Sequence, residues 1–86
     1  MANIKQQKKR VRLAARQRVE NLRYRSTVRT MMRRLRAAAD EGDAERVSTE
    51  HRELQRWIDR AAAKGALHRN AAARKKAQAA RIATRS

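Results

Sequence analysis

The chain contains no proline and only two glycines, Gly42 and Gly65, among its 86 residues. Because proline breaks helices and none is present, long uninterrupted helices are possible. A glycine just beyond the last turn of a helix readily adopts the left-handed conformation that ends it. The two glycines therefore divide the chain into three predicted helices, at about residues 6–40, 44–63 and 70–84.

The residue types between the glycines favour helix over strand. Alanine, arginine, lysine, glutamine, glutamate and leucine dominate, and all of them have high helix propensity. No segment shows a convincing strand pattern. We therefore predict an all-α fold, a three-helix bundle in which residues 1–86 form a single domain with a long, projecting, basic first helix.

The first predicted helix carries two apolar stripes that lie on different faces. At about 100° per residue, the stripe of its first half is turned by well over a quarter of a turn from the stripe of its second half. One straight helix cannot bury both stripes against the same partners, so we expect the second half to pack and the first half to project. The stripes are Val11, Ala15, Val19 and Leu22, and then Val28, Met31, Met32, Leu35, Ala38 and Ala39.

The second predicted helix has a broad apolar face, and the third has a narrow face of small residues. Asp43 and Asn70 are good N-caps, so we expect them to precede these two helices. His51 and Trp57 are interpreted as packing residues, and Leu67 as a side chain that fills the joint between the helices. The faces are Val47, His51, Leu54, Trp57, Ile58, Ala61 and Ala62, and then Ala72, Ala79, Ala80 and Ala83.

The apolar content is small for a folded domain of this length. Leucine, isoleucine and valine together make up only 12 of the 86 residues, and there is no phenylalanine. The formal net charge is +16, so like charges also repel one another across the fold. We expect the free protein to be marginally stable, with a polyanion supplying much of the order.

The positive charge is concentrated toward both ends of the chain. Residues 1–36 carry thirteen basic side chains and a single acid, Glu20, whereas residues 37–63 carry four basic and seven acidic side chains. Residues 64–86 carry seven basic side chains and no acid. Such a distribution fits a polyanionic partner, either a nucleic acid or an anionic membrane surface.

Other functional classes find little support in the sequence. No glycine-rich phosphate loop, GxSxG motif or HExxH motif is present, so we expect no enzyme activity, no cofactor and no small-molecule substrate. With no cysteine and only two histidines, no metal site is expected. No apolar run approaches the roughly 20 residues of a membrane span and no secretory signal is recognisable, so we expect a cytoplasmic location.

The basic side chains of the first predicted helix are the leading candidates for binding. They occur on all faces of the helix, unlike a membrane-surface helix, in which the charges face away from a broad apolar side. Arginine outnumbers lysine 18 to 6 in the chain, which favours forked contacts to phosphates and guanine edges. The residues are Lys8, Lys9, Arg10, Arg12, Arg16, Arg18, Arg23, Arg25, Arg29, Arg33, Arg34 and Arg36.

Two residues outside this basic set also draw attention. Tyr24 stands between two arginines, away from either apolar stripe. It either stacks on a base or ribose or rests its ring under the arginine stems, and the sequence leaves both readings open. His68 lies in a loop beside a helix start, which favours a nucleic-acid contact over core packing.

The third predicted helix begins with the basic run Arg74, Lys75 and Lys76. At about 100° per residue these three side chains point in different directions, so they do not form one flat patch. A polar stripe along the same helix consists of Arg74, Gln78, Arg81 and Arg85.

The residues alone leave the type of nucleic acid open. No helix-turn-helix, basic-zipper or zinc-finger pattern is present. A long helix charged on all sides suits an irregular RNA with several helices better than a regular DNA groove. RNA is therefore the favoured partner, a nucleoid-type DNA-binding protein is the alternative, and a membrane-active cationic helix is a distant third.

Three segments resemble one known family: MANIKQQKKR at residues 1–10, NLRYRSTVRTMMRRLRAA at 21–38 and KGALHRNAAARKKA at 64–77. The resemblance covers nearly the whole chain, in order, and the family is the bacterial small-subunit ribosomal protein numbered twenty. It implies a three-helix bundle that binds small-subunit ribosomal RNA directly and early in assembly, with the long first helix reaching into the RNA. The chain departs from the family pattern at Gln6, Ala71 and Ala77, where hydroxyl side chains are more common.

The expected RNA contacts combine the basic pattern with the positions that match the family motifs. The expected partner is small-subunit (16S-type) ribosomal RNA, with few or no protein contacts and no obligate homo-oligomer. The full set is Lys5, Lys8, Lys9, Arg10, Arg12, Arg16, Asn21, Arg23, Tyr24, Arg25, Ser26, Arg29, Thr30, Arg33, Lys64, His68, Arg69, Asn70, Arg74, Lys75, Lys76 and Arg81.

Overall fold

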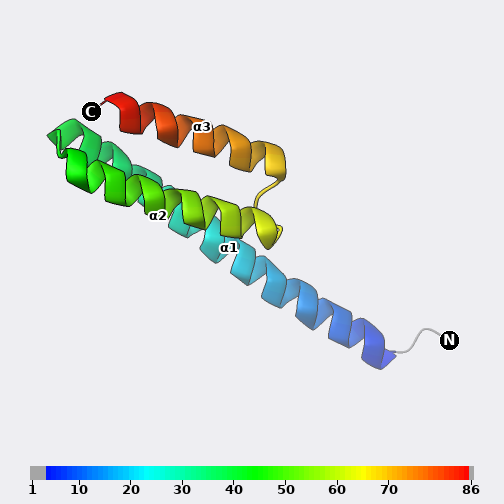
Figure 1. Cartoon of the computed structure of the whole chain (residues 1–86). Helices are drawn as coiled ribbons and strands as arrows, with labels where there is room; N and C mark the ends of the chain where they lie inside the picture. Colours follow the sequence, from blue (N-terminus) through cyan, green and yellow to red (C-terminus); the bar gives the residue numbers. More distant parts are fainter. Residues whose placement is uncertain (1–3, 86) are drawn as a thin grey trace.

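The computed structural model describes residues 4–85 and consists of three α-helices joined by two short turns (Figure 1). The helices are α1 (Ile4–Glu41), α2 (Ala44–Ala63) and α3 (Arg69–Arg85). No strand occurs within this described range. The all-α prediction is confirmed, and the predicted helix boundaries differ from the observed ones by no more than two residues.

The long first helix gives the molecule its elongated shape. The second half of α1 packs against α2 and α3, and its first half continues alone beyond the bundle (Figure 1). The principal-axis extents are 62 × 19 × 13 Å. The radius of gyration is 17.1 Å, compared with about 12 Å expected for a compact chain of this length. We refer to the projecting residues 4–22 as the arm.

The core is confined to the part of the chain that follows the arm. The largest fully buried side chains are aliphatic, and no polar or charged residue is buried among the described residues. Burial of these side chains is the main source of stability, since apolar area removed from water contributes roughly 25 cal/mol per Å². The core consists of Val28, Met32, Leu35, Ala38, Val47, Leu54, Ile58, Ala61, Ala66, Ala72, Ala79 and Ile82.

Both glycines end helices as the sequence predicts. Gly42 has a φ of 72°, its amide donates to the Ala39 carbonyl, and the Asp43 amide donates to the Ala38 carbonyl. This pair of hydrogen bonds is the Schellman arrangement, which satisfies carbonyls left open at a helix end. Asp43 then begins α2, because its carboxylate accepts a hydrogen bond of 3.1 Å from the Arg46 amide.

The second turn repeats this arrangement and adds a contact to α1. Gly65 has a φ of 77°, and the Ala66 amide donates to the Ala61 carbonyl at 2.8 Å. Ala66 is buried, and Leu67 packs against the core as expected. The Arg25 Nε–H donates to the Ala66 carbonyl at 2.9 Å, so the guanidinium fixes this turn against α1.

Two packing predictions for α2 and α1 have different outcomes. His51 is half-buried on the inner side of α2, as expected, and its Nε2 has no hydrogen-bond partner within residues 4–85. The prediction that Tyr24 lies away from the apolar stripes is wrong. Tyr24 packs against the core, and its ring centroid lies 5.9 Å from that of Trp57, with the planes tilted by 53°. Tyr24 precedes Val28 by four residues, so the two side chains share one face of α1.

The third helix differs from the prediction at its start and on its inner face. Asn70 is not the N-cap, because α3 begins at Arg69. The His68 Nδ1 accepts a hydrogen bond from the Asn70 amide, and the His68 carbonyl accepts one from the Ala72 amide, so His68 caps the helix. Ala80 is exposed rather than packed, and Ile82 is the large side chain that α3 contributes to the core.

Candidate nucleic-acid interface

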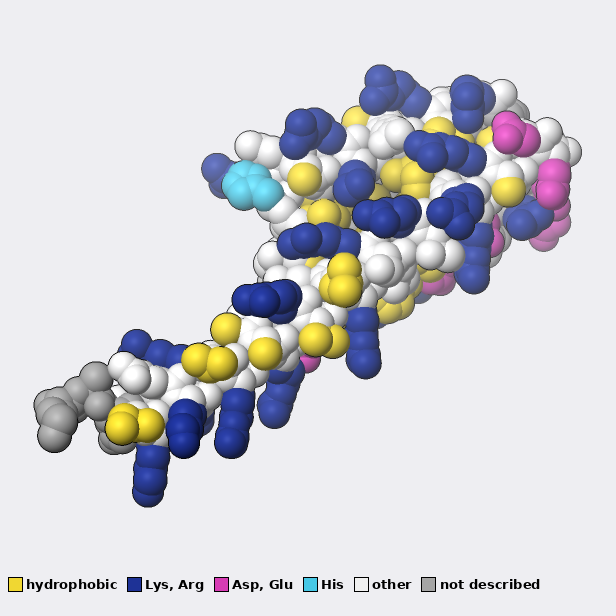
Figure 2. All heavy atoms as spheres, turned by 180° about the vertical axis from the view of Figure 1, so that it is seen from behind, with side chains coloured by type: hydrophobic (Ala, Val, Ile, Leu, Met, Phe, Trp, Pro, Cys, Tyr) yellow, Lys and Arg dark blue, Asp and Glu magenta, His cyan; other side chains and the backbone are white. Residues whose placement is uncertain are grey.

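The two signs of charge are separated in space as well as in sequence. Lysine and arginine side chains cover the arm and extend over the bundle, whereas the acidic side chains visible from this side gather mainly at the end far from the arm (Figure 2). Acids of the bundle also pair with its own cations: Glu41 with Arg46 at 2.7 Å, and Asp59 with Lys76 at 2.8 Å. The acids therefore neutralise charge within the bundle and leave the field of the arm strongly positive.

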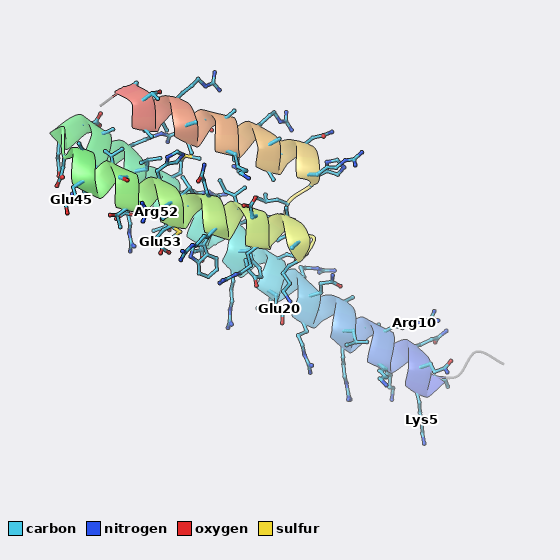
Figure 3. The ribbon with its side chains drawn as sticks, viewed as in Figure 1. Lys5, Arg10, Glu20, Glu45, Arg52 and Glu53 are labelled. Carbon is cyan, nitrogen blue, oxygen red and sulfur yellow. The ribbon has the colours of Figure 1, made fainter. Side chains whose placement is uncertain are left out.

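One side of the arm carries most of its basic side chains. Successive members of the set are three, four or seven residues apart, so at about 100° per residue they lie within a band of roughly 60°. Lys5 and Arg10 project to opposite sides of the helix, so charge is not limited to this band (Figure 3). We call the band the arm stripe; it consists of Lys5, Lys9, Arg12 and Arg16 of the arm, together with Arg23, which directly follows the arm.

The arm stripe refines the prediction that basic side chains occur on all faces. Every residue from Ile4 to Glu20 is exposed, so each face of the arm is open to a partner. Lys8 borders the arm stripe, whereas Arg10 and Arg18 lie across the helix from it. The positive charge of the arm is therefore greater on the side of the arm stripe than on its other sides.

A second basic surface lies on the bundle, along the seam between α1 and α3. Two hollows share Arg36 and Gln78 and so form one continuous groove, which we call the α1/α3 groove. Its apolar floor includes Val28, Met32 and Ile82, and no acidic side chain lines it. The polar and basic lining residues are Arg25, Arg29, Arg36, Lys75, Gln78, Arg81 and Arg85.

The two basic surfaces face different directions. At about 100° per residue, the basic α1 side chains of the groove, Arg25, Arg29 and Arg36, lie roughly 150° around the helix from the arm stripe. They also lie further along α1, since the arm stripe ends at Arg23 and the groove begins at Arg25. A single phosphate backbone running straight along α1 would not contact both surfaces, but two separate backbones could.

The three basic side chains near the start of α3, Arg74, Lys75 and Lys76, point to different surroundings, as predicted. Lys75 lines the α1/α3 groove, whereas Lys76 turns toward α2 and pairs with Asp59. Arg74 is exposed. Lys76 is therefore a weaker candidate for phosphate binding than its neighbour, because a carboxylate already satisfies part of its charge.

The remaining predicted contacts are distributed over α1 and the second turn. Ser26, Thr30 and Arg33 are exposed on α1, and Asn21 is half-buried at the base of the arm. Around the second turn, the exposed residues are Lys64, His68, Arg69 and Asn70. Contacts from these residues to RNA stay predictions, and the imidazole nitrogen of His68 that caps α3 is already engaged.

The set of expected RNA contacts omitted three residues of the groove: Arg36, Gln78 and Arg85. The sequence held a signal for each, since Arg36 belongs to the basic set of the first helix, and Gln78 and Arg85 belong to the polar stripe of the third helix. What the sequence did not contain was the position of that stripe beside α1, which depends on how the helices pack.

Other kinds of site are not apparent in the part of the chain that the structure describes. No group of three or more histidine, cysteine, aspartate or glutamate side chains is placed to hold a metal ion among residues 4–85. No helix in the same range is long and apolar enough to cross a membrane.

Fold and surface together define a small, basic, three-helix protein of the kind that binds a polyanion. Comparison with known families makes this specific: residues 2–83 match the model of the family Ribosomal protein S20. The chain belongs to that family.

Similar proteins support the same assignment across most of the chain. It is 47% identical over 76 residues to the small ribosomal subunit protein bS20 of Corynebacterium jeikeium, covering 88% of this chain and 87% of the other. It is 45% identical to that of Mycolicibacterium smegmatis, covering 88% of both chains. With bS20 of Mycobacterium ulcerans it shares 44% identity over 81 residues, covering 94% and 93%.

Membership of this family confirms the resemblance stated from the sequence. It assigns the chain a structural role in the small ribosomal subunit rather than an enzymatic one, and confirms the expected location in the ribosome of the cytoplasm.

Proposed function

We propose that this protein binds small-subunit ribosomal RNA directly and holds separate segments of that RNA close together during assembly. The observation that carries the proposal is the pair of basic surfaces, the arm stripe on α1 and the α1/α3 groove on the bundle, which face different directions. Folded RNA brings phosphate backbones together at a large electrostatic cost. Cations held between two backbones offset that cost.

The chemistry of the two surfaces suits phosphate. The arm stripe contains both lysine and arginine, whereas six of the seven named groove residues are cations and the seventh is a glutamine. Arginine matches the geometry of phosphate oxygens with two parallel N–H donors, and lysine supplies a compact charge. The apolar floor of the groove lowers the local dielectric constant, which strengthens the attraction of these charges for an anion.

The arm is expected to depend on RNA for much of its order. It has no core residue, and its cations repel one another along roughly five turns of helix. An isolated helix of this length is marginal in water, because nucleation is unfavourable and no tertiary packing compensates. Phosphates on both sides of the arm would remove the repulsion, so helix content should rise when RNA is added.

The partner is expected to be RNA with few or no protein contacts and no requirement for a second copy of the chain. Binding to a transcript of small-subunit ribosomal RNA, compared with random duplex DNA at matched salt, tests this directly. We expect tighter binding to the RNA, with an affinity that falls steeply as salt rises. Equal affinity for the DNA would overturn the proposal in favour of a nucleoid-type protein.

Footprinting of the RNA separates the two surfaces. A variant with Lys9, Arg12 and Arg16 changed to glutamine should lose one protected region, and a variant with Arg36, Arg81 and Arg85 changed to glutamine should lose another. If both variants lost protection at the same nucleotides, the protein would contact one segment and would not hold two together.

A further inference from the structure

A shallow hollow lies at the joint between the arm and the bundle; it is separate from the α1/α3 groove and shares only Arg23 with the arm stripe. Its volume is about 660 Å³, and it is bounded by α1 and by the C-terminal end of α2. Figure 3 places Glu20 here, beneath the point where α1 leaves the bundle. The lining residues that matter below are Glu20, Arg23, Tyr24, Trp57 and Lys64.

The wall of the hollow is aromatic. Tyr24 and Trp57 are the only aromatic side chains in the chain, and both line this hollow. Each is half-buried, so part of each ring stays open to a ligand. The Arg60 guanidinium lies 5.1 Å from the centre of the Trp57 ring but does not line the hollow, so its stacking leaves the space free.

The rim carries two cations and one anion. Arg23 and Lys64 come from α1 and from the end of α2, and both are exposed. Glu20 is the single acid among residues 1–36. Within residues 4–85, neither an ion pair nor a hydrogen bond engages its carboxylate, although Arg16 and Arg23 lie one turn away on the same helix.

The position of Glu20 favours a ligand that carries hydrogen-bond donors. A carboxylate accepts hydrogen bonds and repels phosphate, so it weakens a surface that binds only a backbone. A general reduction of charge repulsion would be served by an acid anywhere along the arm. This acid instead lies beside the two aromatic rings, where a nucleobase could meet a stacking surface and an acceptor together.

Guanine is the base whose edge fits an acceptor-only group best. Its N1–H and N2–H donors are adjacent on the Watson–Crick edge, and the two oxygens of one carboxylate can accept both. Adenine and cytosine present a single amine next to an acceptor, and uracil presents one N–H between two acceptors. An edge used for Watson–Crick pairing is not available to the protein, so the base must be unpaired.

We propose that the hollow binds an unpaired guanine of the RNA, with its ring against Tyr24 and Trp57, its Watson–Crick edge on Glu20 and its phosphates near Arg23 and Lys64. The inference rests on the proposed function and deepens it, since it gives one base contact to a protein that otherwise contacts backbone. Stacking on aromatic side chains with hydrogen bonds to the base edge is a common means of recognising single-stranded RNA.

The single tryptophan of the chain provides a local readout. RNA hexamers of uridine carrying guanosine, adenosine or an abasic site at the third position are titrated against the full-length protein, and Trp57 fluorescence is followed. We expect the guanosine hexamer to quench Trp57 and to bind roughly fivefold or more tightly than the abasic one. Identical responses to the three hexamers would overturn the proposal.

Glu20→Gln separates the base contact from charge. The variant keeps the size of the side chain and removes one negative charge, so affinity for the abasic hexamer should rise slightly while the preference for guanosine falls toward unity. Glu53→Gln on α2 is the matched control, which removes an acid outside the hollow and should keep the preference. An unchanged preference in Glu20→Gln would overturn the role of this carboxylate.

The proposed function is tested separately by binding of small-subunit ribosomal RNA in a gel-shift assay. Normal binding of that RNA with no base preference at Trp57 rejects the guanine site alone. Loss of specific RNA binding altogether rejects the proposed function.

Discussion

The two halves of α1 are continuous in backbone but opposite in environment. Leu22, near the end of the arm, is 63% exposed, whereas Leu35 is fully buried in the bundle. Both halves are rich in arginine and form one uninterrupted helix of 38 residues. The comparison shows that helix formation and core formation are separate properties. High helix propensity along the whole of α1 keeps the helix continuous. The face on which the apolar stripe lies determines which half of the helix is buried.

The exposed apolar side chains of the arm follow from this rotation. Val11, Val19 and Leu22 are 53–68% exposed, because the stripe that they form lies on the side of α1 away from α2 and α3. Charged side chains flank that stripe, which stays visible as a narrow apolar row along the arm (Figure 2). The first half of α1 therefore keeps its apolar side chains exposed, whereas the second half buries them against α2 and α3.

The largest expected effect comes from truncating the buried leucine. Leu35→Ala should lower the free energy of unfolding by about 2–5 kcal/mol, because it removes a fully buried side chain and leaves a cavity. Leu22→Ala, its counterpart on the arm, should change the same quantity by less than about 0.5 kcal/mol. Denaturation followed by circular dichroism measures both.

The leucine comparison needs a variant that keeps the bundle folded, since its core is thin. Leu35→Met preserves volume and should cost less than about 1.5 kcal/mol. If Leu22→Ala destabilised the protein as much as Leu35→Ala, the arm would be packed in solution and the contrast between the two halves of α1 would be wrong.

Much of this contrast was accessible from the sequence. The two glycines gave the three helices, and the angle between the two apolar stripes predicted that the first half of α1 projects. The placing of Tyr24 failed although the signal was present: it lies four residues before Val28 and eleven before Leu35, so helical periodicity puts all three on one face. The error was to take Val28 as the start of the stripe.

Other features depend on packing and could not be predicted from a helical pattern. The α1/α3 groove exists because α3 lies beside α1, and no spacing within either helix records that position. The cap of α3 was misassigned because Asn70 is a better N-cap by residue type, yet the turn after Gly65 brings the His68 imidazole to the Asn70 amide at 3.1 Å. Local propensity was overridden by the geometry of the turn.

Neutralising one side of the arm should have the next largest effect. With Lys9, Arg12 and Arg16 changed to glutamine, the slope of log affinity for RNA against log salt should fall by roughly 2–3, since each lost phosphate contact removes about 0.7–0.9. Unfolding of the bundle should hardly change, because the arm contributes nothing to the core. Affinity measured over a range of salt concentrations gives the slope.

The control for the arm stripe uses the opposite side of the same helix. Changing Arg10 and Arg18 to glutamine removes two charges outside the arm stripe. For each residue changed, the slope of log affinity against log salt should fall by less than in the arm-stripe variant. If every charge contributed equally, the arm would be enclosed by phosphates on all sides, as the sequence suggested, and the arm stripe would have no special role.

A smaller effect is expected where the arm meets the bundle. Arg25→Lys keeps the charge but removes the Nε–H that donates to the Ala66 carbonyl, so the free energy of unfolding should fall by about 1 kcal/mol. The salt dependence of RNA binding should not change. Arg29→Lys, one turn further along α1, is the matched control and should leave stability unaltered. An equal loss in both variants would mean that arginine stems, rather than this hydrogen bond, stabilise the joint.

The smallest effect concerns two adjacent lysines of α3, and it tests whether the packed half of the molecule also binds RNA. Lys75 lines the α1/α3 groove, whereas Lys76 pairs with Asp59. Lys75→Gln should lower the salt slope by up to about 0.9, the value of one phosphate contact. Lys76→Gln should leave the slope unchanged and cost at most about 1 kcal/mol of stability, as expected for an exposed ion pair. If Lys76→Gln lowered the slope and Lys75→Gln did not, the RNA would contact the side of α3 that faces α2. The α1/α3 groove would then have no binding role, and of the two halves of α1 only the arm would keep one.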